Sequence, residues 1–310
     1  MAQLTRKRVI LIEAESSYGT DPTPSATDVV LVRDLSITPQ SSDVVNRDVV
    51  RPYLGASEQL LANTRVECTF SVELAGSGTA GTAPRYGSAL KACGFSESIS
   101  GGNTVTYAPV SASFTSVTIH YNVDGVRHIV TGCRGNFSIS TSVGEIPSID
   151  FSFTGIYNAP TDTALPSVTY GDQATPLVFK NGNTSGFSLL SYSGALMSLT
   201  MDVGNSLVYR ELVGGTKEVL ITDRAANGSV TIEAPTMAQK DYFTAALTDT
   251  TLGNLAFLHG TTAGNRVQLT SSKVDIGDVA YGEADGVAML EIPYTLVPSA
   301  ANNEVSLIFT

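Results

Sequence analysis

Two short patterns in the sequence resemble motifs that carry chemistry. Residues 76–81, GSGTAG, have the spacing G-x-G-x-x-G, in which glycines let the backbone approach the pyrophosphate of a dinucleotide. The strand expected before this segment is half polar, whereas a central parallel strand is nearly all apolar. Ser88 and Lys91 have the S-x-x-K spacing of serine acylases, but the sequence contains neither S-D-N nor K-T-G. The sequence therefore favours a flexible loop followed by a helix over both kinds of site.

The three histidines and three cysteines do not form a metal-binding pattern. The cysteines are far apart and make no C-x-x-C pair, so we expect reduced thiols. His120 and His128 flank an Asp-Gly turn at 124–125, which places His120 opposite Ile129 and Tyr121 opposite His128. The two imidazoles then lie on opposite faces of the hairpin and cannot share a metal. We expect no catalytic residues, no cofactor and no metal.

The composition narrows the class of protein further. The 310 residues include 18 Lys and Arg against 29 Asp and Glu, which gives a formal charge of −11. An acidic chain without a basic run is a poor candidate for gripping nucleic acid, because phosphate binding needs clustered Lys and Arg. No apolar run is long enough for a signal-peptide core or a membrane span. We therefore expect a soluble protein made in a cytoplasm, with no membrane partner.

Most of the sequence has the rhythm of β-strands. In residues 66–74 and 148–154, apolar and polar residues alternate, which predicts strands with one buried and one wet face. Only two helices are expected, at about 84–93 and 237–247. The first has Pro84 at its start and Gly94 beyond its end. The fold class is therefore mainly β.

Segments of the first half recur in the second half. Residues 63–70 align with 227–234, and residues 148–153 align with 289–294. Other short segments match in the same order, and each expected helix follows a repeated strand. Any two β-rich stretches align loosely, but the shared order favours a duplication.

The repeat predicts a domain organisation. We expect an N-terminal arm at 1–27, a first β domain at 28–160, a linker at 161–184 and a second β domain at 185–310. Each domain is expected to be a β-barrel or β-sandwich with one flanking α-helix. The linker is rich in Pro, Gly and Asn, which favour turns and loops.

A long polar segment interrupts each repeat at the same place, at residues 39–62 and 201–226. Long loops in compact domains are uncommon and usually functional. Each combines apolar residues with both signs of charge, as a contact surface does. The alternative is a floppy insertion or an extended hairpin without a partner. The candidate contact residues are Arg47, Asp48, Arg51, Tyr53, Leu54 and Glu58 in the first segment, and Tyr209, Arg210, Glu211, Lys217 and Glu218 in the second.

Carboxylates recur on the polar faces of the expected strands. Such residues are often merely solvated, and the functional alternative is a surface that repels polyanions. The candidates are Glu67, Glu73, Asp150, Glu233 and Glu291.

Five segments together carry a resemblance to a known family. They are ESSYGTDPTP (15–24), LKACGF (90–95), VTYAP (105–109), GCRGN (132–136) and FTGIYNAP (153–160). In this order they resemble the major tail tube protein of long non-contractile-tailed (siphovirus-type) bacteriophages. The resemblance is strongest over about residues 1–165.

The resemblance implies a structural virion protein of the phage tail, assembled in the host cytoplasm. Its copies join sheets edge to edge into rings that stack into a tube, and a long loop reaches the neighbouring ring. Two tube-like domains per chain imply a trimeric ring with pseudo-sixfold symmetry. The acidic candidates would face a lumen through which DNA passes as cargo during ejection. The implied partners are copies of the chain, a tape-measure protein, and tail terminator and distal tail proteins.

Two other classes remain as alternatives. An extracellular β-sandwich adhesin or carbohydrate-binding module would carry a secretion signal and exposed aromatic platforms, and the chain has no Trp. A β-rich enzyme would need a convergent polar pocket, and no motif predicts one.

Overall fold

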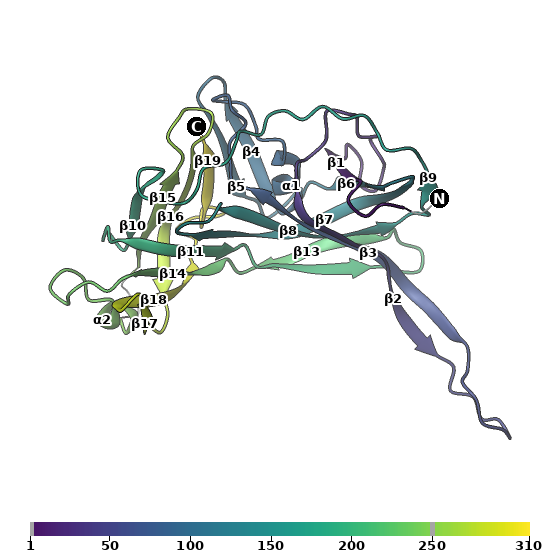
Figure 1. Ribbon diagram of the computed structural model, residues 1–310. Helices are drawn as coiled ribbons and strands as arrows, with labels where there is room; N and C mark the ends of the chain where they lie inside the picture. The colour runs from purple at the N-terminus through teal and green to yellow at the C-terminus, as the bar shows by residue number, and fades with distance from the viewer. Residues whose placement is uncertain (1–2, 249–251) are drawn as a thin grey trace.

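The computed structural model describes residues 3–248 and 252–310, and in this part of the chain it is mainly β (Figure 1). The elements of the first half are β1 (Arg8–Ala14), β2 (Arg33–Asn46), β3 (Gln59–Glu73), α1 (Gly87–Ala92), β4 (Phe95–Ser100), β5 (Thr104–Pro109), β6 (Val117–Val123), β7 (Val126–Ser142), β8 (Ser148–Tyr157) and β9 (Thr161–Asp162). Those of the second half are β10 (Thr184–Leu189), β11 (Leu196–Asp202), β12 (Asn205–Arg210), β13 (Glu218–Arg224), β14 (Asn227–Glu233), α2 (Tyr242–Ala246), β15 (Gly253–His259), β16 (Val267–Ile276), β17 (Ala280–Ala284), β18 (Val287–Leu296) and β19 (Ser306–Phe309).

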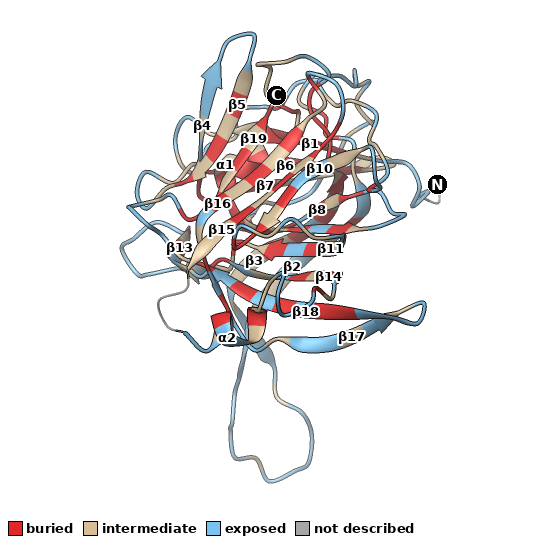
Figure 2. Ribbon diagram, turned by 90° about the vertical axis from the view of Figure 1, so that its left-hand side faces the viewer, coloured by how far each residue is buried: buried red, intermediate tan, exposed pale blue. Residues whose placement is uncertain are grey.

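The alternating pattern forms the predicted strands. In β8, and in β3 from Val66 onwards, every second side chain is buried. Phe70, Phe151 and Phe153 pack together with ring centroids 5.3–5.9 Å apart. Fully burying one such side chain contributes about 1.5–3 kcal/mol. Buried apolar side chains from both halves form one continuous cluster. Figure 2 colours the buried residues red, and they lie in strands of both halves.

Eight strands run side by side in the order β2–β3–β8–β7–β11–β14–β18–β17, and every neighbouring pair is antiparallel. We call these strands the long sheet. Its first four strands come from the first half and its last four from the second. The two halves join where β7 pairs with β11, and a second joint links β5 to β19.

The second four strands of the long sheet repeat the first four. Ser36 on β2 lies opposite Thr69 on β3. Ser198 on β11 lies opposite Thr231 on β14, and each of these residues is 162 positions after its counterpart (198 − 36 and 231 − 69). The neighbouring pairs match at the same offset. The structure thus contains the internal repeat, while the domain boundaries at 28–160 and 185–310 remain a prediction.

The repeat extends to the N-terminal segment, which was expected to be an arm without a counterpart. All seven residues of β1 pair with β6, and Ile10, Leu11 and Ile12 are buried. In the second half β10 pairs with β15 in the equivalent place. The apolar run in β1 therefore belongs to the folded body, because it fills the position beside the first strand of the hairpin.

Each half has one short helix, as predicted, and both are shorter than the sequence suggested. The side chain of Asp241 caps α2 by accepting a hydrogen bond from the Thr244 amide at 2.9 Å. Gly94 follows α1 with a φ of 82°, which favours glycine and ends the helix. In the described part of the chain, no helix has the length and apolar character needed to cross a membrane.

The glycine-rich segment 76–81 packs one half of the chain against the other. The amide of Gly78 donates to the carbonyl oxygen of Gly264 at 2.9 Å. A Cβ on Gly76 would lie 2.1 Å from the same oxygen. These glycines are needed because two backbones approach each other closely, which gives the spacing a structural role.

Candidate functional site

The five predicted carboxylates lie on one face of the long sheet. Residues opposite each other in an antiparallel pair point to the same side. Glu67 and Glu73 on β3 therefore share a face with Asp150 on β8, since Asp150 lies opposite Ser71. Across the β7–β11 joint the same face continues to Glu233 and Glu291. We call this surface the acidic face.

Sequence reasoning missed a sixth carboxylate on this face. Asp202 on β11 lies opposite Ser138 of β7, and Ser138 lies opposite Asp150 of β8. Asp202 was assigned to the long segment 201–226. In the sequence, Asp202 continues the alternation of polar residues with Leu199 and Met201, which are buried, and this pattern could have shown that Asp202 belongs to a strand.

Small hydroxyl side chains occupy most of the remaining positions of the acidic face. The Ser71 hydroxyl donates to Asp150, and the hydroxyls of Thr200 and Ser229 are 2.9 Å apart. Arg33, Arg65 and Arg134 are the basic residues among the pairs described for this face. Arg134 is paired with Glu218 of β13. Arg65 neutralises Glu67 locally, with Nε 3.4 Å from the carboxylate. The face as a whole is hydrophilic and net negative.

The long sheet has two free edges among the residues described. β2 pairs only with β3, and β17 pairs only with β18. Each therefore presents unpaired backbone N–H and C=O groups, which are a template for another strand. Figure 2 shows β17 along the margin of the body, and Tyr281 on it is 65% exposed.

The first long segment is a hairpin that projects from the body (Figure 1). β2 and β3 continue into it, and residues 47–58 form its tip. Val50 and Leu54 at the tip are completely exposed. Arg47 and Arg51 both pair with Glu58, at 3.2 and 3.5 Å. We call residues 39–62 the projecting hairpin; an exposed apolar tip of this kind is typical of an interaction surface.

The second long segment lies against the first half of the chain. It contains the separate hairpin β12–β13. The Glu218 carboxylate is 3.1 Å from the Arg134 guanidinium, and the Tyr209 hydroxyl donates to the Thr64 carbonyl oxygen at 3.2 Å. Lys217 and Glu211 form a more exposed pair at 3.0 Å, and Arg210 is exposed. The stacking role assigned to these residues remains a prediction.

Tyr18 and Arg134 hold β13 in place. The Tyr18 hydroxyl accepts a hydrogen bond from the Val219 amide at 2.6 Å and donates to the Gly132 carbonyl oxygen at 3.0 Å. The Arg134 guanidinium lies 4.8 Å from the centre of the Tyr18 ring. Burial raises the pKa of Tyr18 to about 12, so the hydroxyl stays protonated and can donate. The family-like segments ESSYG and GCRGN thus meet in space.

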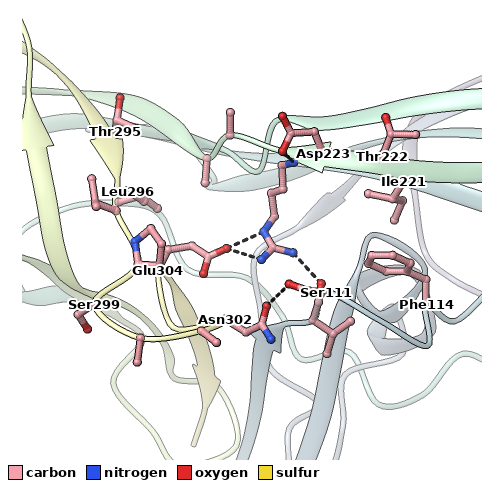
Figure 3. A pocket seen from close by; sticks show the side chains of 18 residues that line it. Ser111, Phe114, Ile221, Thr222, Asp223, Thr295, Leu296, Ser299, Asn302 and Glu304 are labelled. Atoms are coloured by element: carbon pink, nitrogen blue, oxygen red, sulfur yellow. Dashed lines mark hydrogen bonds and ion pairs between the residues drawn. The ribbon is translucent and has the colours of Figure 1, made fainter.

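A cavity of about 730 Å³ lies where β13, the β5–β6 connection and the β18–β19 connection meet (Figure 3). Its charged residues satisfy each other: the Arg224 Nε donates to the Glu304 carboxylate at 2.6 Å, and its Nη1 donates to the Val110 carbonyl oxygen at 2.9 Å. Ser111 donates to Asn302. This arrangement pairs no nucleophile with a base, so the cavity offers no catalytic constellation.

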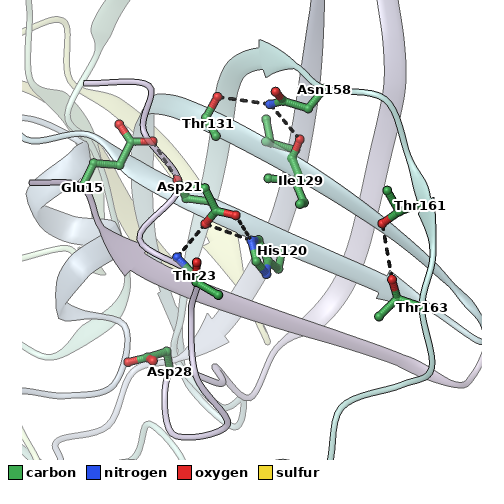
Figure 4. A network of polar contacts seen from close by, with 12 residues as sticks. Glu15, Asp21, Thr23, Asp28, His120, Ile129, Thr131, Asn158, Thr161 and Thr163 are labelled. Carbon is green, nitrogen blue, oxygen red and sulfur yellow. Dashed lines mark hydrogen bonds and ion pairs between the residues drawn. The ribbon is translucent and has the colours of Figure 1, made fainter. Parts of the chain in front are cut away.

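A polar network fixes the segment after β1 to the body (Figure 4). The Glu15 carboxylate accepts hydrogen bonds from the amides of Gly19 and Gly132, at 2.7 and 2.6 Å. His120 Nε2 lies 3.0 Å from the Asp21 carboxylate. Burial lowers the pKa of His120, and Asp21 partly offsets that shift. His120 lies opposite Ile129, as the sequence predicted.

Metal-ligating side chains do not gather elsewhere in the described ranges, where no three His, Cys, Asp or Glu residues are placed to hold an ion. The three cysteines are buried and free, and burial raises the pKa of each thiol. Buried thiols of this kind are unreactive.

Comparison with known proteins places the chain in a family. A family model described as phage tail tube protein matches residues 5–296. A search of curated proteins gave no match. Because the family match covers nearly the whole chain, both halves are included in it. The chain therefore belongs to the phage tail tube protein family, and it is a structural component of the virion tail.

Proposed function

We propose that the chain polymerises into rings that stack into the tail tube, and that the acidic face lines the bore through which DNA passes. The observation that carries the proposal is the long sheet itself. It has one polar, net negative face and one unpaired edge at each end. A sheet of this form closes into a barrel when its two edges meet those of neighbouring copies.

The internal repeat supports a ring of three chains. Each chain supplies two quartets of strands, so three chains supply six equivalent units around the ring. The joint between two units is already built once within each chain, where β7 meets β11. A trimeric ring therefore has pseudo-sixfold symmetry.

The acidic face suits the lining of a conduit for DNA. Carboxylates repel phosphates over about one Debye length, ~8–10 Å at physiological ionic strength. The hydroxyl groups between them remain hydrated and expose no apolar surface to the duplex. We infer that Glu67, Glu73, Asp150, Asp202, Glu233 and Glu291 keep the passing DNA from adhering.

The projecting hairpin supports stacking between rings. It carries exposed apolar side chains beyond the body of its own chain, and burying them stabilises a contact by roughly 25 cal/mol per Å². A contact between different surfaces of identical rings repeats without closing, which generates a filament. Tail terminator and distal tail proteins would close the two ends of this filament, and a tape-measure protein would occupy its lumen during assembly.

Negative-stain microscopy of the purified chain tests the proposal. We expect rings in end view and tubes at high protein concentration. A protein that stays monomeric at every ionic strength and concentration, without rings or tubes, would contradict the proposal and favour the β-sandwich adhesin class.

A further inference from the structure

We infer that β17 of one chain pairs with β2 of a second copy in a defined register, with Gly282 opposite Ser41 and Ala284 opposite Thr38. The inference rests on the proposed ring and adds to it the residues that meet at the joint between chains. It follows from the joint that the structure already contains between β7 and β11.

The within-chain joint gives the template. Across it, Ser138 of β7 lies opposite Asp202 of β11, and Ser140 lies opposite Thr200. The amide of Val203 continues the pairing by donating to the Phe137 carbonyl oxygen at 3.1 Å. The free edges β17 and β2 are the counterparts of these two strands in the repeat.

The position of β17 follows from the pairs that precede it in the sheet. Ser71, Asp150 and Ser138 lie in one row across β3, β8 and β7. The equivalent row in the second half contains Glu233, Met289 and Gly282. Gly282 is therefore the counterpart of Ser138, and by the same rule Ala284 is the counterpart of Ser140.

The position of β2 follows from the offset between β2 and β11. Ile37 lies opposite Cys68, and the equivalent pair is Leu199 with Val230, again 162 positions later. Thr200 then corresponds to Thr38. The pairing of β2 shifts by one residue after Thr38, so Arg65, the counterpart of Asn227, lies opposite Ser41, and Ser41 is the counterpart of Asp202. Combining the two rows places Gly282 opposite Ser41.

The aromatic side chains on the core-facing side of β7 and β17 agree with this register. Phe137 lies under the β7–β11 joint and is 1% exposed. Its counterpart is Tyr281, which is 65% exposed at the edge of the lone chain. Phe137 packs on Phe95 just after α1, and Tyr281 packs on Phe243 of α2 at 5.3 Å. A second copy of β2 would cover Tyr281 as β11 covers Phe137.

The joint between chains lacks two supports that the joint within the chain has. Asn136 donates to Asp202 at 2.7 Å and accepts from the Asn205 amide at 3.0 Å. The counterpart of Asn136 is Ala280, and that of Asp202 is Ser41. The β4–β5 hairpin, which pairs with β19, also has no equivalent, because only residues 247–252 separate α2 from β15. The ring is therefore weakest between chains.

Disulfide trapping tests the register. The double variant Gly282→Cys with Ser41→Cys should form covalent dimers and trimers on oxidation, seen on non-reducing gels. The two positions lie at opposite edges of one chain, so any bond joins two chains. The native cysteines are buried and do not compete. The matched control is Gly282→Cys with Thr38→Cys, because Thr38 belongs to the next row of pairs on the same face of β2.

The outcomes separate this inference from the proposed ring. Cross-linking of the control pair alone would overturn the register. Rings seen by microscopy without cross-linking of either pair would overturn the β17–β2 joint and leave the proposed ring standing. If neither the variants nor the wild type form rings, and no cross-links appear, the β17–β2 joint and the proposed ring would both be overturned.

A gain-of-function variant gives an independent check that needs no oxidation. Ala280→Asn with Ser41→Asp should recreate the Asn136–Asp202 hydrogen bond between chains. We expect the concentration for half-assembly to fall by roughly five-fold or more, as a hydrogen bond to a carboxylate provides. Ala280→Asn alone is the control. No difference between the double variant and this control would contradict the inference.

Discussion

Arg224 and Glu304 form an ion pair that is enclosed where the two halves of the chain meet. Their side chains are only 12% and 8% exposed, and Arg224 also donates to the Val110 carbonyl oxygen of the first half. A buried pair of this kind stabilises little relative to an apolar replacement of both residues, but removing one partner leaves a charge without compensation.

We expect Arg224→Met to lower the free energy of unfolding by about 3–5 kcal/mol, measured by urea denaturation. The control is Lys217→Met, since Lys217 pairs with Glu211 in a more exposed position and should cost less than about 1 kcal/mol. Equal losses for the two variants would show that the buried pair has no special role in joining the halves.

The Glu283 side chain lies on the core-facing side of the free edge strand β17, the same side as Tyr281. Its counterpart is the buried Ile139, and inward charges on edge strands oppose pairing. Glu283→Ile should therefore lower the concentration needed for ring formation by several-fold, measured by sedimentation. Unchanged or weaker assembly would contradict the placement of β17 at the joint.

Removing residues 44–60 from the projecting hairpin should abolish tube growth but leave rings and a folded body. Within the part of the chain that the structure describes, the hairpin tip makes no hydrogen bond or ion pair outside residues 39–65. Thermal unfolding and microscopy report the two properties separately. Tubes of normal length from the deletion variant would show that stacking uses another surface.

Charge reversal on the acidic face should make the tube retain DNA. We expect tubes of Asp150→Lys with Glu291→Lys to bind a short duplex at low salt and release it as salt increases, because the attraction is screened. A filter-binding assay measures the retained fraction. The neutral variant Asp150→Asn with Glu291→Gln is the control for changes in shape, and equal retention by the two would argue against a bore lined by this face.

The stability of the monomer should fall as the pH decreases from about 7 towards 5.5. His259 Nε2 donates to the Leu177 carbonyl oxygen at 3.1 Å, and burial lowers the pKa of its ring below the ordinary value of 6.5. The unfolded chain then takes up a proton more readily than the folded one, so acid favours unfolding. Urea unfolding at several pH values measures the slope.

His259→Gln should make that pH dependence shallower, although it lowers stability overall. His120 and His128 also have lowered pKa values because of burial, so a part of the slope should remain. A slope identical to that of the wild type would exclude His259 as a contributor.

The alternation of apolar and polar residues was enough to predict the strands and the face of each carboxylate. The hairpin at Asp124-Gly125 also formed in the predicted register, with Val123 opposite Val126. Both features depend on local sequence: the period of two sets the buried face, and the turn residues set the hairpin.

The alignment of the two repeats illustrates what the sequence could not decide. Sequence similarity matched residue 63 with residue 227, but the strand pairing matches Arg65 with Asn227. A slip of two residues leaves the same side chains buried, so the pattern does not distinguish the two registers. The β7–β11 joint was also beyond prediction, because it depends on contacts between strands that are distant in the chain.

The β4–β5 hairpin lies beside β19, with which β5 pairs, and among the residues described only the first half of the chain carries such a hairpin (Figure 1). In a tube of trimeric rings it would form three ridges per turn, alternating with three smooth stretches. Image averaging with imposed sixfold symmetry would blur those ridges to half density, whereas threefold averaging would keep them sharp. The hairpin is thus a built-in rotational landmark, and tagging its turn at 101–103 would label every second unit around the tube.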